Sequence, residues 1–169
     1  MNLYDLMKNR RSIREFSNKN VSKEKLNSIL RAGQLSLSGV NQKPFVYIVI
    51  DNPDLKKKIK LYCESADKNF YDNSSECFKK WMKEKKISLK KESLKDAPYL
   101  VIVAGETDKP AWLESTWISI AYVILAAEYE GLVTLTYTPA KLDFLNDLLT
   151  LPKMLKPVSI IPVGYNKNP

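Results

Sequence analysis

The segment ESTWISIAYVILAAEYEG, residues 114–131, most restricts what this chain can fold into. The helix that it predicts is apolar almost all the way round, which is typical of a helix at the centre of a domain rather than at its surface. Its longest apolar run, residues 117–127, is shorter than the roughly 20 residues that a membrane span requires. We therefore expect a central, water-excluded helix that ends at Gly131.

Other elements follow from apolar runs and helical spacing. Runs at 45–50, 97–105, 132–137 and 157–165 predict strands, and further helices are expected near residues 3–7, after Ser22, over 55–66 and over 142–149. Strands that alternate with helices in this way indicate an α/β or α+β fold in which helices pack against a sheet. With 169 residues and no linker-like tract, the whole chain is expected to form one domain, residues 1–169.

Residues 67–95 are polar, dotted with aromatic side chains and weakly patterned, so we expect them to leave the core as a lid-like excursion. Much of the net charge of +8 lies here, in KKWMKEKKISLKKESLK, where Lys and Glu are interspersed as on a solvated helix. No nucleic-acid motif accompanies the charge. We therefore expect a small anionic ligand, no nucleic-acid or membrane partner, and, since no signal-peptide core is present, a cytoplasmic protein.

The residue types that are missing exclude much chemistry. The chain has no histidine, so a histidine base, a Ser-His-Asp triad and a histidine metal site are excluded. Cys63 and Cys77 do not form a CxxC pair, and no metal site is expected. The five glycines form neither GxGxxG nor a P-loop, so a phosphate would have to be held by side chains.

NRRSIREF, residues 9–16, supplies such side chains. Guanidinium groups bind phosphate oxygens in a bidentate, charge-assisted manner, and a serine hydroxyl adds a donor, so Arg10, Arg11, Ser12 and Arg14 could form an anion site. By itself the cluster is equally compatible with a solvated basic turn.

The ordered set RRSIREF, SLSGVNQKPF, APYLVIVAG, GLVTLTYTP and IIPVGY resembles the FMN-dependent nitroreductase family over nearly the whole chain. Within that family, the T-x-T-P segment is most similar to the iodotyrosine deiodinase branch. The resemblance implies a central mixed β-sheet flanked by helices, and a homodimer with active sites between its subunits.

The resemblance also implies a cofactor, FMN. Arg10, Arg11, Ser12 and Arg14 would hold its phosphate and ribityl end, Ser38 and Gly39 would contact it from the second subunit, and the isoalloxazine would lie along the segment Thr136, Tyr137, Thr138. Thr138 would be the catalytic residue, with its hydroxyl near flavin N5, where it favours one-electron steps. The alternative is that Thr138 only precedes Pro139 in an extended turn.

For the substrate, the resemblance implies a small aromatic molecule held by Val40, Asp67, Tyr71 and Lys91. Asp67 would pair with the ammonium of a halotyrosine and Lys91 with its carboxylate, Tyr71 would hydrogen-bond either, and the backbone N–H of Val40 would meet the phenolate. The chain departs from the family pattern in three respects. Asp67 replaces a longer Glu, the spacing from Tyr71 to Lys91 is one residue short, and a C-terminal basic phosphate ligand is missing, for which Lys167 is a weak substitute.

The expected function is therefore FMN-dependent reductive dehalogenation of a halotyrosine, or reduction of a related aromatic substrate. Two alternatives remain: a generic NAD(P)H-dependent nitroreductase or quinone reductase, and a non-catalytic flavin-binding relative or one that binds no flavin.

Overall fold

A four-stranded sheet forms the centre of the computed structural model, which describes residues 2–168. Its order is β1-β2-β4-β3, with β1 (Phe45–Ile50), β2 (Tyr99–Glu106), β3 (Val133–Thr134) and β4 (Leu155–Gly164). All neighbouring strands pair antiparallel, and an isolated parallel bridge joins Ser12 to Thr134. The α+β class is confirmed, and the parallel component of the expected mixed sheet is limited to that bridge.

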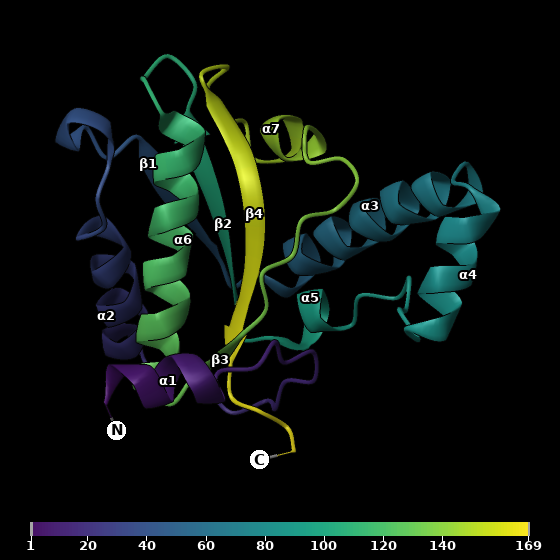
Figure 1. Cartoon of the computed structure of the whole chain (residues 1–169), viewed down its shortest axis with the longest axis horizontal. Helices are drawn as coiled ribbons and strands as arrows, with labels where there is room; N and C mark the ends of the chain where they lie inside the picture. The colour runs from purple at the N-terminus through teal and green to yellow at the C-terminus, as the bar shows by residue number, and fades with distance from the viewer. Residues whose placement is uncertain (1, 169) are drawn as a thin grey trace.

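Helices cover both faces of the sheet (Figure 1). On one face lie α2 (Lys23–Gln34) and α6 (Trp112–Tyr129), and on the other lie α3 (Pro53–Asp72), α5 (Ser93–Asp96) and α7 (Phe144–Leu148). Val101 and Val103 of β2 pack into the first core, whereas Leu100 and Ile102 pack into the second. Burial from both sides explains why β2 reads as a continuous apolar run instead of an alternating one.

Side-chain caps set where four helices begin. The side chains of Asn2, Ser22, Asn52 and Ser75 each accept a hydrogen bond from a backbone N–H in the first turn that follows. These bonds satisfy amides that have no partner within the helix. The capped helices are α1 (Leu3–Asn9), α2, α3 and α4 (Glu76–Glu84).

The apolar helix predicted at 114–131 is α6, but a single chain buries only part of its surface. Ser119, Ile120 and Val123 are buried, while Trp117 and Tyr122 are about 40% exposed. The expected burial all round is therefore not reached within one chain. No helix among residues 2–168 is long and apolar enough to cross a membrane.

The third strand is shorter than the predicted run 132–137. β3 pairs with β4 only at Val133 and Thr134, and the ladder resumes at Tyr137, whose N–H and C=O both bond to Ile160. In this register Leu135 stands opposite Pro162, which has no N–H to donate. Proline therefore interrupts the strand and leaves residues 135–140 as an extended segment beside the sheet.

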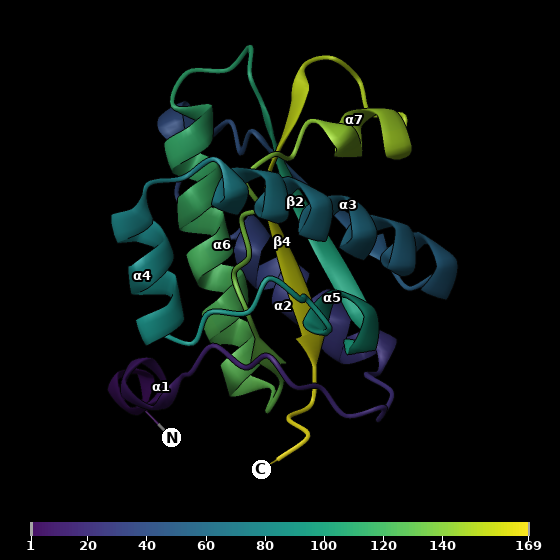
Figure 2. The same cartoon turned by 90° about the vertical axis from the view of Figure 1, so that its right-hand side faces the viewer.

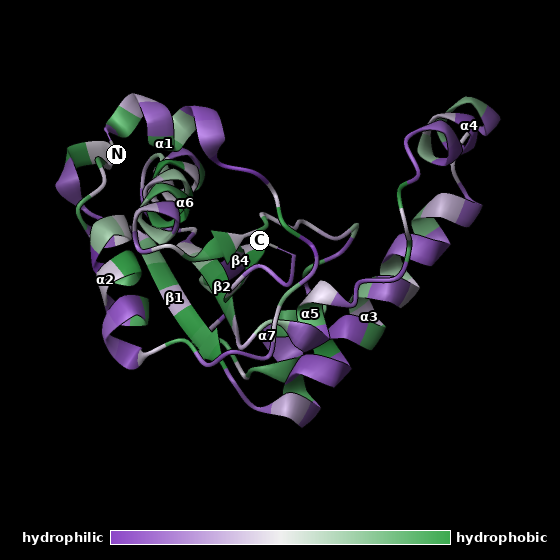
Figure 3. Cartoon of the chain, turned by 90° about the horizontal axis from the view of Figure 1, so that it is seen from below, coloured by the Kyte–Doolittle hydropathy of each residue, from purple (hydrophilic) through white to green (hydrophobic). Residues whose placement is uncertain are grey.

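Residues 67–95, expected as an excursion from the core, are mostly helical. α3 continues to Asp72, α4 follows at its far end, and a loop returns the chain to α5. Figures 1 and 3 show α4 standing away from the sheet, while Figure 2 shows the returning loop passing in front of β4.

Gly33 of α2 is expected to resist substitution. A Cβ there would lie 2.1 Å from the Tyr47 hydroxyl and 2.6 Å from Cγ2 of Val123. At an open helical position Gly→Ala gains about 1 kcal/mol, whereas forcing extra volume into a packed contact costs about 1–3 kcal/mol. We expect Gly33→Ala to lower the free energy of unfolding measured in urea, and Gln34→Ala, at an exposed neighbour, to leave it nearly unchanged. Equal stability of the two variants would contradict this packing.

Candidate functional site

Two adjoining cavities lie between the extended segment 135–140 and the excursion 67–95. The aromatic cavity has a volume of about 420 Å³ and the cationic cavity about 630 Å³, and both are lined by Ile87, Lys91 and Tyr137. Volumes in this range are usual for small-molecule sites.

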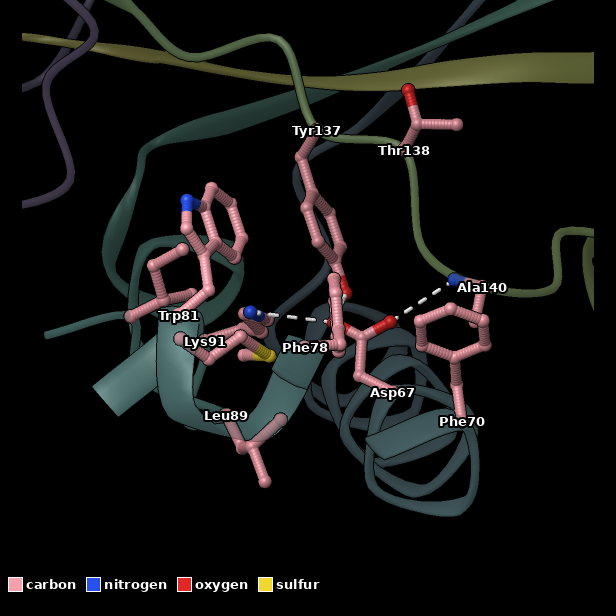
Figure 4. Close-up of a pocket in the computed structure, with 11 residues that line it drawn as sticks. Asp67, Phe70, Phe78, Trp81, Leu89, Lys91, Tyr137, Thr138 and Ala140 are labelled. Atoms are coloured by element: carbon pink, nitrogen blue, oxygen red, sulfur yellow. Dashed lines mark hydrogen bonds and ion pairs between the residues drawn. The ribbon is translucent and has the colours of Figure 1, made fainter. Parts of the chain in front are cut away.

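The aromatic cavity is walled by rings from α3 and α4. Phe70 and Phe78 meet edge to face with centroids 5.5 Å apart, and Trp81 lies 5.7 Å from Phe78. Figure 4 shows these rings around Tyr137 and the Asp67 carboxylate. Phe70 and Trp81 are about half exposed, so the wall is open to an incoming apolar or aromatic group.

Asp67 is the polar centre of this cavity, and its carboxylate is already engaged (Figure 4). Its Oδ2 accepts a hydrogen bond from the Tyr137 hydroxyl at 2.8 Å, and its Oδ1 accepts one from the Ala140 N–H at 3.0 Å. The Lys91 ammonium lies 3.3 Å from Oδ2. Asp67 on α3 therefore ties together the loop before α5 and the segment that follows β3.

Lys91 is held from several sides. Its ammonium donates to the backbone carbonyl of Ser88 and lies 5.3 Å from the centroid of the Tyr137 ring, and its backbone N–H donates to Glu64. The side chains of Lys91 and Asp67 are only 17% and 16% exposed. This half-buried pair is therefore screened less than a surface salt bridge.

Tyr137 and Cys63 stay protonated at neutral pH. Burial, with the neighbouring Cys63 and Asp67 adding to it, raises the pKa of the Tyr137 phenol above its ordinary value. Burial also raises the pKa of the Cys63 thiol to about 12. Tyr137 therefore donates a hydrogen bond to Asp67 as a neutral phenol.

The cationic cavity carries more positive than negative charge, because the Glu92 carboxylate that also lines it is paired with Lys60. Within residues 2–168, no carboxylate lies within 4 Å of Arg14, Lys85, Lys86 or Lys90, all of which line it. Thr136 also lines this cavity. Unpaired cations beside a hydroxyl provide what an anionic ligand needs.

Several residues predicted from the sequence come together here. Arg14, Thr136 and Tyr137 line the cationic cavity, and Asp67, Lys91, Tyr137 and Thr138 line the aromatic cavity. Figure 4 shows the Thr138 side chain turned away from Asp67.

Other predicted residues lie outside the two cavities. Tyr71 borders a smaller neighbouring cavity of about 370 Å³. Ser12 bridges to Thr134, and the Arg11 guanidinium donates to the carbonyls of Lys8 and Arg10. Arg10, Arg11 and Ser12 are not among the lining residues of the aromatic or the cationic cavity.

Ser38, Gly39 and Val40 lie apart from the rest. Gly39 begins the short 3₁₀ helix η1 (Gly39–Asn41), and its N–H donates to Ser115 near the start of α6. In Figure 1, η1 and the segment 10–14, which follows α1, are at opposite ends of the molecule. Val40 is 86% exposed and has a positive φ of 51°, which is unusual for a β-branched residue.

The aromatic wall was missed by the sequence reading. Phe78, Trp81 and Met82 have the i, i+3, i+4 spacing of one helix face, behind Ser75 as the cap, which is the signal that could have identified it. Cys63 enters the sequence analysis only as half of an absent CxxC pair, yet it lies in the core beside Tyr137 and Asp67.

Comparisons with known proteins agree with this architecture. The nitroreductase family model matches residues 7–165. The chain is 35% identical to an iodotyrosine deiodinase of Thermotoga neapolitana, covering 99% of this chain and 90% of the relative, and 29% identical to that of Haliscomenobacter hydrossis, covering 96% and 78%. A crystal structure of an oxidized iodotyrosine deiodinase bound to FMN and 3-iodo-L-tyrosine matches with a TM-score of 0.95 and 35% identity, over 99% of this chain and 91% of that one. The relatives named here are iodotyrosine deiodinases, and this chain belongs to the nitroreductase family.

Proposed function

We propose that this protein is an FMN-dependent oxidoreductase that reductively dehalogenates a halotyrosine or reduces a related aromatic substrate. The observation that carries the proposal is the likeness, over nearly the entire chain, to a deiodinase that binds FMN and 3-iodo-L-tyrosine. In the reaction two electrons and one proton replace the carbon–halogen bond by a carbon–hydrogen bond and release halide.

The cationic cavity fits the cofactor. Arg14 and the lysines of the loop 85–90 supply positive charge for an anionic ligand, and Arg10, Arg11 and Ser12 lie just before Arg14 in the chain. We assign these four N-terminal residues to the phosphate and ribityl end of FMN, and Thr136, Tyr137 and Thr138 to its ring system. The flavin supplies the electron chemistry, which is consistent with a chain that has no histidine.

The aromatic cavity fits the substrate. The half-exposed rings of Phe70 and Trp81 offer packing for the phenol ring of a halotyrosine, and the Lys91 ammonium can pair with the carboxylate of that substrate. Tyr71, one helical turn after Asp67, borders the neighbouring cavity, and we assign it a hydrogen bond to the same ligand. We assign residues 67–95 the role of a lid over it.

A second copy of the chain is expected to complete the site. Exposed apolar side chains gather on α1, on the segment 35–40 and on the outer side of α6: Leu3, Tyr4, Met7, Leu35, Leu37, Val40, Leu113, Trp117, Tyr122 and Tyr129. A patch of this kind is typical of an interface. Association through it would let Ser38, Gly39 and Val40 serve the cavities of the other copy, and sedimentation should give the mass of a dimer.

A ligand screen tests the proposed function. The purified protein should be yellow, and halotyrosines should quench the fluorescence of its bound FMN. Tyrosine and nitroaromatics serve as comparisons in the same titration. Quenching by nitroaromatics without any by halotyrosines would favour a generic NAD(P)H-dependent nitroreductase, and a colourless protein that does not bind added FMN would favour a flavin-free relative.

Thr138→Ala is expected to slow dehalogenation more than nitro reduction. A threonine hydroxyl can act as donor or acceptor as flavin N5 changes its protonation state, and only the one-electron route depends on that adjustment. Rates of iodide release and of nitroaromatic reduction, measured on the same FMN-loaded sample, give the comparison. Thr150→Ala, at an exposed loop position, serves as the control. Equal slowing of both reactions would leave Thr138 only a structural role before Pro139.

A further inference from the structure

The Asp67 carboxylate has little capacity left for a substrate. An ionised carboxylate has about four acceptor positions. Tyr137 donates to Oδ2, which also faces the Lys91 ammonium in an ion pair at 3.3 Å, and Ala140 donates to Oδ1. A substrate ammonium would have to share these oxygens with three groups that already contact them, or displace one of them.

The same bonds fix the segment that carries Thr138. Upstream, the Tyr137 backbone is held by Ile160 and by the Ser159 hydroxyl, which donates to its carbonyl. Downstream, the Ala140 N–H is held by Asp67. Pro139 between them is buried and has a restricted φ. Thr138 thus lies between two residues whose positions are fixed by hydrogen bonds. Asp67 accepts a bond from each of them, from the Tyr137 side chain and from the Ala140 N–H.

We propose that Asp67 is a positioning residue that holds the segment Tyr137–Ala140, and with it Thr138, against α3, so that the site reads the carboxylate of an aromatic substrate through Lys91 and not its ammonium. The substrate class is therefore halogenated hydroxyphenyl carboxylates, with or without an α-amino group. This part of the inference rests on the proposed function, whereas the anchoring does not.

Amide hydrogen exchange in the purified holoprotein, without added substrate, tests the anchoring. Hydrogen bonds to charged acceptors are strong, so Asp67→Ala should speed exchange at the Ala140 amide by roughly 10- to 100-fold. Asp67→Asn keeps one acceptor oxygen instead of two, for which the Tyr137 hydroxyl and the Ala140 N–H would compete. Exchange at the Ala140 amide should therefore be about 10-fold faster, and adding Tyr137→Phe should not speed it further. If Asp67→Ala does not fold, Asp67→Asn decides.

Asp72→Asn is the matched control for this experiment. Asp72 lies on the same helix, but it is exposed and pairs with Lys68 one turn away. Exchange at Ala140 should be unchanged in that variant. Unchanged exchange in Asp67→Asn as well would overturn the positioning role.

Quenching of FMN fluorescence tests the specificity. The affinities of 3-iodo-L-tyrosine and 3-(3-iodo-4-hydroxyphenyl)propionate, which lacks the ammonium, should differ less than fivefold, whereas the methyl ester of iodotyrosine, which lacks the carboxylate, should bind at least about tenfold more weakly. A preference of fivefold or more for iodotyrosine over the propionate would overturn the proposed specificity. If that preference disappeared in Asp67→Asn, Asp67 would be the contact of the ammonium. If no halogenated ligand binds, the proposed function fails and the specificity with it, while the exchange experiment still decides the anchoring.

Discussion

Arg14→Ala is expected to weaken FMN binding by about one to two orders of magnitude. Arg14 lines the cationic cavity and pairs with no carboxylate in the described part of the chain, so its charge is available to the ligand. Its guanidinium donates within the chain to the Ser12 carbonyl at 3.4 Å, a long bond that a phosphate or a flavin carbonyl can replace. Each charge-assisted bond that is lost costs about 1.5–3 kcal/mol.

Titration of the apoprotein with FMN, followed by flavin fluorescence, measures this effect. Arg31→Ala is the matched control, because Arg31 is exposed on α2 and lines none of the cavities described here. FMN affinity that is the same in Arg14→Ala and in Arg31→Ala would show that Arg14 does not contact the cofactor.

Lys91→Ala is expected to weaken 3-iodo-L-tyrosine binding by about one to two orders of magnitude and 2-iodophenol binding only slightly. The Lys91 ammonium is half-buried beside Asp67 and Tyr137, where a bond to a carboxylate is worth about 1.5–3 kcal/mol. The neutral phenol presents no carboxylate, so it reports any loss of general pocket shape.

FMN fluorescence quenching by the two ligands gives the comparison, with Lys95→Ala on α5 as an exposed lysine control. Equal losses for both ligands would mean that Lys91 maintains the cavity instead of reading the substrate.

The sequence predicts the fold well where the signal is local. The strands β1, β2 and β4 and the helices α2, α3 and α6 follow from runs and periodicities that each element contains. The end of β3 could not be predicted in this way. Its own residues are strand-like up to Tyr137, but the missing donor lies in Pro162 of the neighbouring strand. The boundary thus depends on a residue 27 or more positions away, which only the register reveals.

The candidate site is predictable only in part for the same reason. Arg14, Thr136 and Lys91 were predicted from motifs of the family, and they do line one cavity. The engagement of Asp67 was not predictable, because its partners Tyr137 and Ala140 are 70 and 73 residues away in the chain. The aromatic wall depends likewise on α4 folding back beside the end of α3, which the helical spacing within α4 does not reveal.

Iodide release tests the central proposal most directly. The FMN-loaded protein is reduced with dithionite under anaerobic conditions and mixed with 3-iodo-L-tyrosine, and iodide and tyrosine are quantified together. One iodide and one tyrosine are expected for each reduced flavin. Reoxidation by a nitroaromatic with neither iodide nor tyrosine formed from iodotyrosine would contradict it and leave a generic nitroreductase.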